Sequence, residues 1–128
     1  MPIDSLVNSK EFRFYCFTNQ YVDTVFFYKS IIELEEVRSW NRGHCNKGTI
    51  FKFPQSEGLL EIEESEDTPL FQGAGLYIEV DDVDYWYNRM VSKGVRIKQA
   101  ISDTSYGHRS FKLEDPNNLS VGLFRYLQ

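Results

Sequence analysis

The sequence is poor in cysteine and histidine, with two of each in 128 residues. Two cysteines do not make a disulfide framework. Cys16 lies in an apolar stretch and is expected to be buried, whereas Cys45 lies in a polar loop. No apolar run approaches membrane length, and no basic-then-apolar leader opens the chain. We therefore expect a soluble, cytoplasmic protein that makes no contact with a membrane.

Positive charge is also in short supply. The chain has 14 Lys and Arg against 19 Asp and Glu, a net charge of −5 and an isoelectric point near 5.0. Nucleic acid phosphates would be repelled by this charge, so nucleic acid is not expected as a partner. The acidity favours a cationic or neutral ligand.

Familiar catalytic motifs are absent from the sequence: it has no glycine-rich phosphate loop, nucleophile elbow or recognisable Cys/His spacing. His44 and Cys45 are adjacent in a polar loop, and in an extended backbone their side chains would point apart. His108 enters the last hairpin. We expect surface or loop hydrogen bonding from both histidines.

Aromatic residues are abundant, at 16% of the chain. In a domain of this size, such residues fill a core, line a pocket or cover a subunit interface. The length suffices for one domain with its own core, and we expect a single domain over residues 1–128.

The apolar pattern predicts one order of elements twice, after a polar lead-in over residues 1–10. Repeat one, about 12–64, has a strand at 12–17, a helix at 21–32 and strands at 34–40, 49–53 and 59–63. Repeat two, about 75–126, has a strand at 75–80, a helix that starts at 83 and strands at 95–101, 109–113 and 119–126. Each repeat therefore reads βαβββ.

Residues with known preferences mark the helix ends and the last turn. Thr18 and Asn19 are candidate caps of the first helix, and Asp81 or Asp82 of the second, which Gly94 should end. The segment 115–118, Asp-Pro-Asn-Asn, has the composition of a tight turn and predicts a closing hairpin.

The closing hairpin and two further motifs resemble the vicinal oxygen chelate superfamily, which includes glyoxalase I, extradiol dioxygenases and bleomycin-resistance proteins. The further motifs are Phe-Tyr-x-x-x-Ile at 27–32, and Val-Asp-Asp-Val-Asp at 80–84 with Lys-Gly-Val at 93–95. The resemblance covers about residues 12–126. It implies an α+β fold of two tandem βαβββ modules, whose open-sided mixed sheets surround a cavity.

Enzymes of that superfamily bind a divalent ion through His, Glu, His and Glu. The resemblance matches these positions to Phe12 or Arg13, then Glu61, Gly75 and Gly122. Only Glu61 is a ligand type, and one carboxylate with waters does not hold such an ion. We therefore expect no metal, no cofactor and no catalytic residues, with Arg13 a candidate salt-bridge partner of Glu61.

The metal-free branch of the superfamily, the bleomycin-resistance proteins, works by binding, as dimers with two shared clefts. The resemblance thus implies a metal-independent small-molecule binding protein, a homodimer whose aromatic, partly acidic cleft takes a cationic or aromatic ligand, and a role in antibiotic resistance. Glycine at two ligand positions would leave room for a larger guest. The candidate ligand-binding residues are Trp40, Phe51, Glu61, Tyr77, Tyr106 and Phe124.

Two other functions stay open. One is a glyoxalase-like metal-dependent lyase or isomerase, or a dioxygenase-related enzyme, with an unconventional metal or with Glu61 as a general base. The other is a dimeric interaction or regulatory module. For each aromatic residue, packing in the core is the alternative to binding a ligand.

Overall fold

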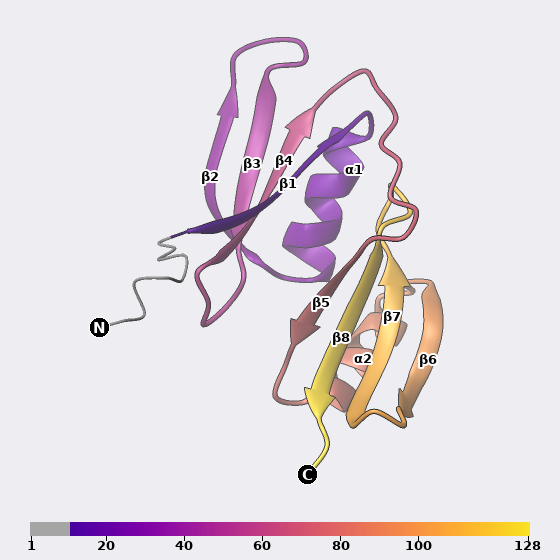
Figure 1. Cartoon of the computed structure of the whole chain (residues 1–128). Coiled ribbons are helices and arrows are strands. Elements are labelled where there is room, and N and C mark those ends of the chain that lie inside the picture. The colour runs from indigo at the N-terminus through magenta and orange to yellow at the C-terminus, as the bar shows by residue number, and fades with distance from the viewer. Residues whose placement is uncertain (1–10) are drawn as a thin grey trace, which may run out of the picture.

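The chain forms two four-stranded mixed sheets and two helical segments, an α+β arrangement of two tandem modules (Figure 1). The computed structural model describes residues 11–128, so the predicted lead-in lies outside the described residues. Neither sheet closes into a barrel. The first module contains β1 (Phe12–Thr18), α1 (Tyr21–Phe26), η2 (Phe27–Ile31), β2 (Glu35–Asn41), β3 (Lys47–Lys52) and β4 (Gly58–Glu64). The second contains β5 (Gly75–Glu79), α2 (Val83–Ser92), β6 (Ile97–Asp103), β7 (His108–Glu114) and β8 (Ser120–Tyr126).

The two sheets have the same topology, which confirms the predicted repeat. Sheet A has the strand order β1-β4-β3-β2 and sheet B the order β5-β8-β7-β6. In each sheet the first strand of the module pairs in parallel with the last, and the other pairs are antiparallel. All eight predicted strands are present.

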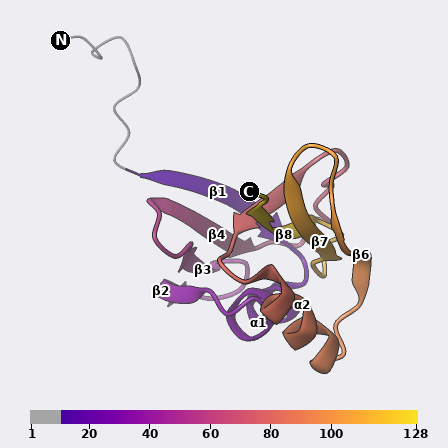
Figure 2. The same ribbon diagram turned by 90° about the horizontal axis from the view of Figure 1, so that it is seen from below.

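The helices cover one face of the sheets and leave the other open. Figure 2 shows α1 and α2 side by side on the same side of the strands. Strand alternation sends Leu60 and Ile62 of β4, and Val121 and Leu123 of β8, toward this helical side. One cluster of buried apolar residues includes members of both modules, so the modules share a core.

The two helices differ in regularity. The predicted helix at 21–32 is α-helical only to Phe26 and π-helical from Phe27 to Ile31. Its N-cap is Gln20, without a capping side chain, so the predicted caps are wrong. The Thr18 hydroxyl is engaged elsewhere, since it accepts from the Gln20 amide and bonds to Asn117. In contrast, Asp82 caps α2 as predicted, by accepting from the Tyr85 amide at 3.0 Å.

The β7–β8 turn of the second module is buried against the first. Asp115 accepts hydrogen bonds from the Tyr28 hydroxyl at 2.8 Å and from the backbone amides of Asn117 and Leu119. Asn117 accepts from the Thr18 hydroxyl at 2.6 Å. The turn predicted from its composition is therefore also a polar link between the modules.

A second link joins the helices. Lys93, just beyond α2, donates to the backbone carbonyls of Ser30 and Ile31 and to the Glu33 carboxylate. Arg89 also pairs with Glu33. These two cations lower the pKa of Glu33. Within the described residues, no helix is long and apolar enough to span a bilayer.

Candidate functional site

The face of sheet A away from the helices carries acidic, basic and aromatic side chains. We call it open face A. Residues directly opposite each other in a sheet share a face. One row across the sheet joins Trp40, Gly48 and Glu63, and the next joins Ile50, Glu61 and Tyr15. The predicted residues Trp40 and Glu61 thus lie on the same face, in neighbouring rows.

Glu61 is held by an arginine. Arg13 Nη1 lies 2.8 Å from Glu61 Oε1, and the Glu61 side chain is only 15% exposed. The expected salt-bridge partner of Glu61 is therefore confirmed. The hydrogen bonds with Glu61 and Glu11 raise the pKa of Arg13, so this guanidinium stays charged.

A tyrosine and a tryptophan complete open face A. A hydrogen bond with Glu63 raises the pKa of Tyr15 to about 12. The Trp40 ring lies directly over Gly48, where an added Cβ would sit 2.1 Å from ring atom Cζ2. The guanidinium carbons of Arg38 and Arg42 are each 5.9 Å from the ring centroid. Trp40 is thus already engaged with cations.

The corresponding face of sheet B, open face B, carries a cluster of rings. His108 stacks on Phe124 with centroids 4.6 Å apart and planes 23° apart. Tyr106 and Tyr126 pack edge-on against the same imidazole at 5.2 and 4.7 Å. The predicted residues Tyr106 and Phe124 thus meet around His108, which the sequence analysis expected only as a loop or surface group.

The remaining predicted residue of open face B, Tyr77, lies over a glycine. A Cβ at Gly122 would come within 2.7 Å of the Tyr77 ring, and Lys112 Nζ lies 5.4 Å from the ring centroid. The expectation that Gly122 leaves room for a guest is therefore wrong, because the neighbouring ring fills that space. Tyr77 as a residue is 59% exposed, so part of its surface is open to a ligand.

Phe51 does not belong to either open face. It is opposite Leu60 in the sheet, is fully buried and packs against Tyr28 with ring centroids 6.4 Å apart. Phe51 was predicted to bind the ligand, and its position in the core corrects that prediction. Its neighbour Ile50, opposite Glu61, is the residue on open face A.

The four positions matched to the superfamily's metal ligands do not fit a divalent ion. Gly75 and Gly122 offer no side-chain donor, and Arg13 brings a positive charge to Glu61. A cation would have to displace that guanidinium and find its other ligands among waters.

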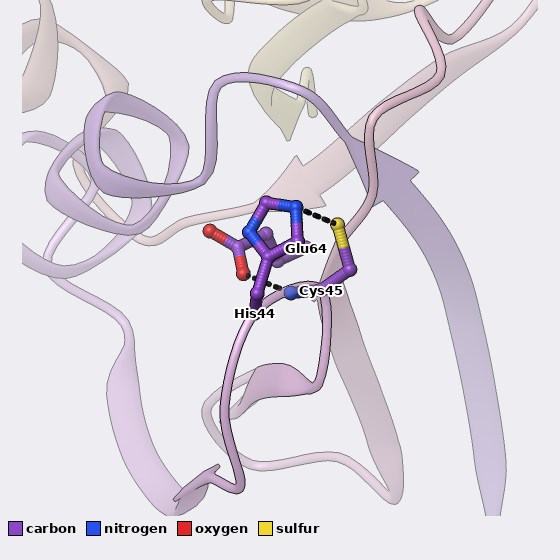
Figure 3. A group of neighbouring side chains, drawn as sticks. All are labelled: His44, Cys45 and Glu64. Carbon is purple, nitrogen blue, oxygen red and sulfur yellow. Dashed lines mark hydrogen bonds between the residues drawn. The ribbon is translucent and has the colours of Figure 1, made fainter.

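A different group of potential ligands does converge. His44 Nε2 and Cys45 Sγ are 3.4 Å apart, and together with Glu64 their ligand atoms lie within 4.8 Å of one another (Figure 3). The expectation that His44 and Cys45 point apart is wrong, because the backbone is not extended there. Cys45 has φ +55°, in the left-handed region.

Several hollows lie on the surface of the described residues, and two of them follow the seam between the modules. One of about 310 Å³ is lined by Leu34, Ile78 and Trp86, among others. Another of about 450 Å³ lies between the start of β1 and β5, and Tyr77 borders it. Trp40 borders a further hollow of about 460 Å³, beside β2 and β3.

Several residues of the open faces escaped the sequence analysis, namely Tyr15, His108, Lys112 and Tyr126. Strand alternation carries the signal for the last three. A hairpin that closes at 115–118 places His108 opposite Tyr126 and Lys112 opposite Gly122. Tyr15 needed the parallel pairing of β1 with β4, which joins residues 46 positions apart in its pair with Glu61.

A protein-family model matches most of this chain. A sequence-family model described as Glyoxalase/Bleomycin resistance protein/Dioxygenase superfamily matches residues 13–123. A comparison with curated protein sequences found no match.

Solved structures show the same fold. TnmS3, an antibiotic binding protein from Streptomyces sp. CB03234, superposes with a TM-score of 0.78 at 19% identity, over 94% of this chain and 98% of that one. A glyoxalase/bleomycin resistance protein from the same organism gives 0.71 at 20% identity, over 88% and 97%. Lactoylglutathione lyase from Agrobacterium tumefaciens gives 0.71 at 17% identity, over 93% and 95%. These identities establish the fold alone. With the family model covering most of its length, the chain belongs to the Glyoxalase/Bleomycin resistance protein/Dioxygenase superfamily.

Proposed function

We propose that this protein is a metal-independent binding protein for a small aromatic or cationic molecule. Of the predicted residues, we retain Trp40 and Glu61 on open face A, and Tyr77, Tyr106 and Phe124 on open face B. The observation that carries the proposal is the chemistry of these faces. The positions that hold a metal in related enzymes offer one carboxylate, already paired with Arg13, while exposed rings surround them.

The rings suit stacking with a flat guest. Tyr77 is 59% and Tyr106 69% exposed, and the stacked pair of His108 and Phe124 lies between Tyr106 and Tyr126. Rings that pack against one another, as those around His108 do, lose little entropy when they bind a ligand. Open face B therefore supplies most of the contact area for a planar ligand.

Acidic groups favour a guest with positive charge. Glu61 and Glu63 lie on open face A, and Glu79 is exposed on open face B. The net charge of −5 draws cations toward the protein at low ionic strength. A cationic group would compete with Arg13 for Glu61, and its rings would stack on the tyrosines.

A second copy of the chain completes the cleft in this proposal. Small-molecule sites bury most of the ligand surface, whereas one open face contacts a ligand from one side only. A homodimer that places open face B of one copy over open face A of the other would enclose the guest between rings and carboxylates. TnmS3, which has the same fold, is an antibiotic binding protein, and this similarity supports a small-molecule ligand.

A thermal-shift panel of planar cationic compounds, run with a chelator present, tests the proposal. A compound that binds only the folded state adds about 2.7 kcal/mol of stability at 100 times its Kd. We expect at least one compound to raise the melting temperature, and Phe124→Ala and Glu61→Gln to reduce that rise. Glu57→Gln, in the exposed β3–β4 turn, is the matched control for charge.

Two outcomes would contradict the proposal. One is that no compound shifts the melting temperature. The other is that the shift requires a metal and disappears with the chelator, which would favour a glyoxalase-like enzyme. If the ligand-bound protein sediments as a monomer, the dimeric cleft is excluded, but the proposed binding function is not.

A further inference from the structure

We infer that His44, Cys45 and Glu64 bind a divalent transition-metal ion such as Zn²⁺ at the turn between β2 and β3. The three residues come from two segments: the turn provides the imidazole and the thiol, and the end of β4 provides the carboxylate. Figure 3 shows the three side chains gathered around one point beside the turn.

The spacing of the ligand atoms fits one ion. Zn–N and Zn–S bonds of about 2.0 and 2.3 Å at a tetrahedral angle place the two ligand atoms about 3.5 Å apart. The observed separation of His44 Nε2 and Cys45 Sγ is 3.4 Å, and all three ligand atoms lie within 4.8 Å of one another. Small side-chain rotations are enough to close the set around an ion.

The backbone already holds the set together. Glu64 Oε1 accepts a hydrogen bond from the Cys45 amide at 2.8 Å, which ties β4 to the turn. The left-handed conformation of Cys45 brings its thiol back toward the preceding imidazole. Most of the ordering that a metal site requires is therefore present without the ion.

A second carboxylate lies beside the imidazole. Glu66 Oε2 is 3.3 Å from His44 Nε2, although Glu66 is outside the group of three whose ligand atoms converge. Lys47 is the nearest cation to Glu64, with its Nζ 4.0 Å from Glu64 Oε2. The two carboxylates, Glu64 and Glu66, outnumber the nearby Lys47, so the local charge favours a bound cation. The thiol, imidazole and carboxylates match Zn²⁺ and Co²⁺ better than Mg²⁺ or Ca²⁺, which prefer oxygen alone.

The group is separate from the open faces. Successive side chains of β4 point to opposite sides of the sheet. The Glu64 side chain therefore lies on the opposite side of the sheet from Glu61 and Glu63. Binding would form a metal–sulfur bond and release the Cys45 thiol proton to solvent, without oxidation or reduction. The inference therefore does not depend on the proposed ligand-binding function.

Co²⁺ titration of the chelator-treated full-length protein tests the site. We expect a thiolate-to-cobalt charge-transfer band that saturates at one ion per chain, and Zn²⁺ should abolish it. Cys45→Ala should remove the band, while His44→Ala and Glu64→Gln should weaken Co²⁺ binding at least tenfold. Cys16→Ala and Glu61→Gln are the controls, and both should keep the band.

Either of two results would overturn the inference: no saturable band in the native protein, or a band of unchanged strength in Cys45→Ala. Loss of the ion in Glu61→Gln with retention in Cys45→Ala would also overturn it, and would place a metal on open face A instead. Circular dichroism of each variant shows whether it is folded, and the ligand panel with chelator reports separately on the proposed function.

Discussion

The two modules repeat one topology but use it for different chemistry. In both, alternate strand residues are apolar and pack under the helices. The free face of the first module carries ion pairs and hydrogen-bonded acids, such as Arg13 with Glu61 and Tyr15 with Glu63. The free face of the second carries a stack of rings around His108. The core thus constrains one side of each sheet and leaves the other side free to diverge.

The equivalent hairpin turns differ in the same way. The β3–β4 turn is exposed, and the Ser56 hydroxyl merely closes it by accepting from the Gly58 amide at 2.9 Å. The β7–β8 turn carries the buried Asp115 and Asn117, which bond to the first module. One turn only reverses the chain, and the other also joins the two modules.

The largest effect should come from the buried turn. Asp115→Ala leaves the Tyr28 hydroxyl and two backbone amides without their acceptor, and should lower the free energy of unfolding by about 3 kcal/mol. Ser56→Ala in the exposed turn is the matched change and should cost under about 1 kcal/mol. Urea unfolding measures both. Equal costs would show that the two turns are equivalent.

The next largest loss of stability should come from the contacts in which an aromatic ring covers a glycine. Gly48→Ala collides with Trp40 and should cost about 1–2 kcal/mol, because Gly48 is buried. Gly122→Ala should cost less, because the exposed Tyr77 ring can swing away. In a Trp86→Phe background, Trp40 is the sole tryptophan, and its emission should shift to the red in Gly48→Ala. An unchanged spectrum would contradict the contact.

The link between the helices should respond to pH. Arg89 and Lys93 lower the folded-state pKa of Glu33, so its stabilising effect is present above the ordinary glutamate pKa and is lost as pH falls through the lowered value. Glu33→Gln should therefore destabilise by about 0.5–1 kcal/mol at pH 7, and by less in acid. Urea unfolding across pH measures the difference, and Glu57→Gln is the control. A constant difference would exclude this ion pair as its source.

The smallest expected effect is a difference in reactivity between the two thiols, with no change in stability. Burial, followed by the charges of Asp115 and Glu61, raises the pKa of Cys16 to about 12, whereas Cys45 lies in a surface turn. A thiol reagent should label one cysteine in the native protein and both after unfolding, and Cys45→Ala should remove the native label. Native labelling of Cys16 would show that the shared core opens easily.

Local patterns predict much of the fold. They do not always show which residues of a strand face the helices and which face the open side. In β3 the neighbours Ile50 and Phe51 are both apolar, so alternation alone does not tell which one faces the helix. Pairing with β4 decides it, because Phe51 is opposite the buried Leu60 and Ile50 is opposite Glu61. The assignment of Phe51 to the ligand site failed for this reason.

The helix and loop corrections also have physical causes. The expected caps failed because the Thr18 hydroxyl is drawn into the network with Asn117, 99 positions away. His44 and Cys45 were expected to diverge because neighbouring side chains point apart in an extended backbone, but Cys45 has a left-handed conformation, which is uncommon for a cysteine. Contacts distant in sequence, or unusual local conformations, decided these cases.

The sequence by itself determined the repeat and the order of strands and helices, because periodicity and turn composition are local properties. Only the tertiary structure decided which rings meet on open face B, that Tyr77 covers Gly122, and that His44, Cys45 and Glu64 converge. Those contacts depend on strand register and on backbone turns that bring distant residues together, and no local pattern specifies them.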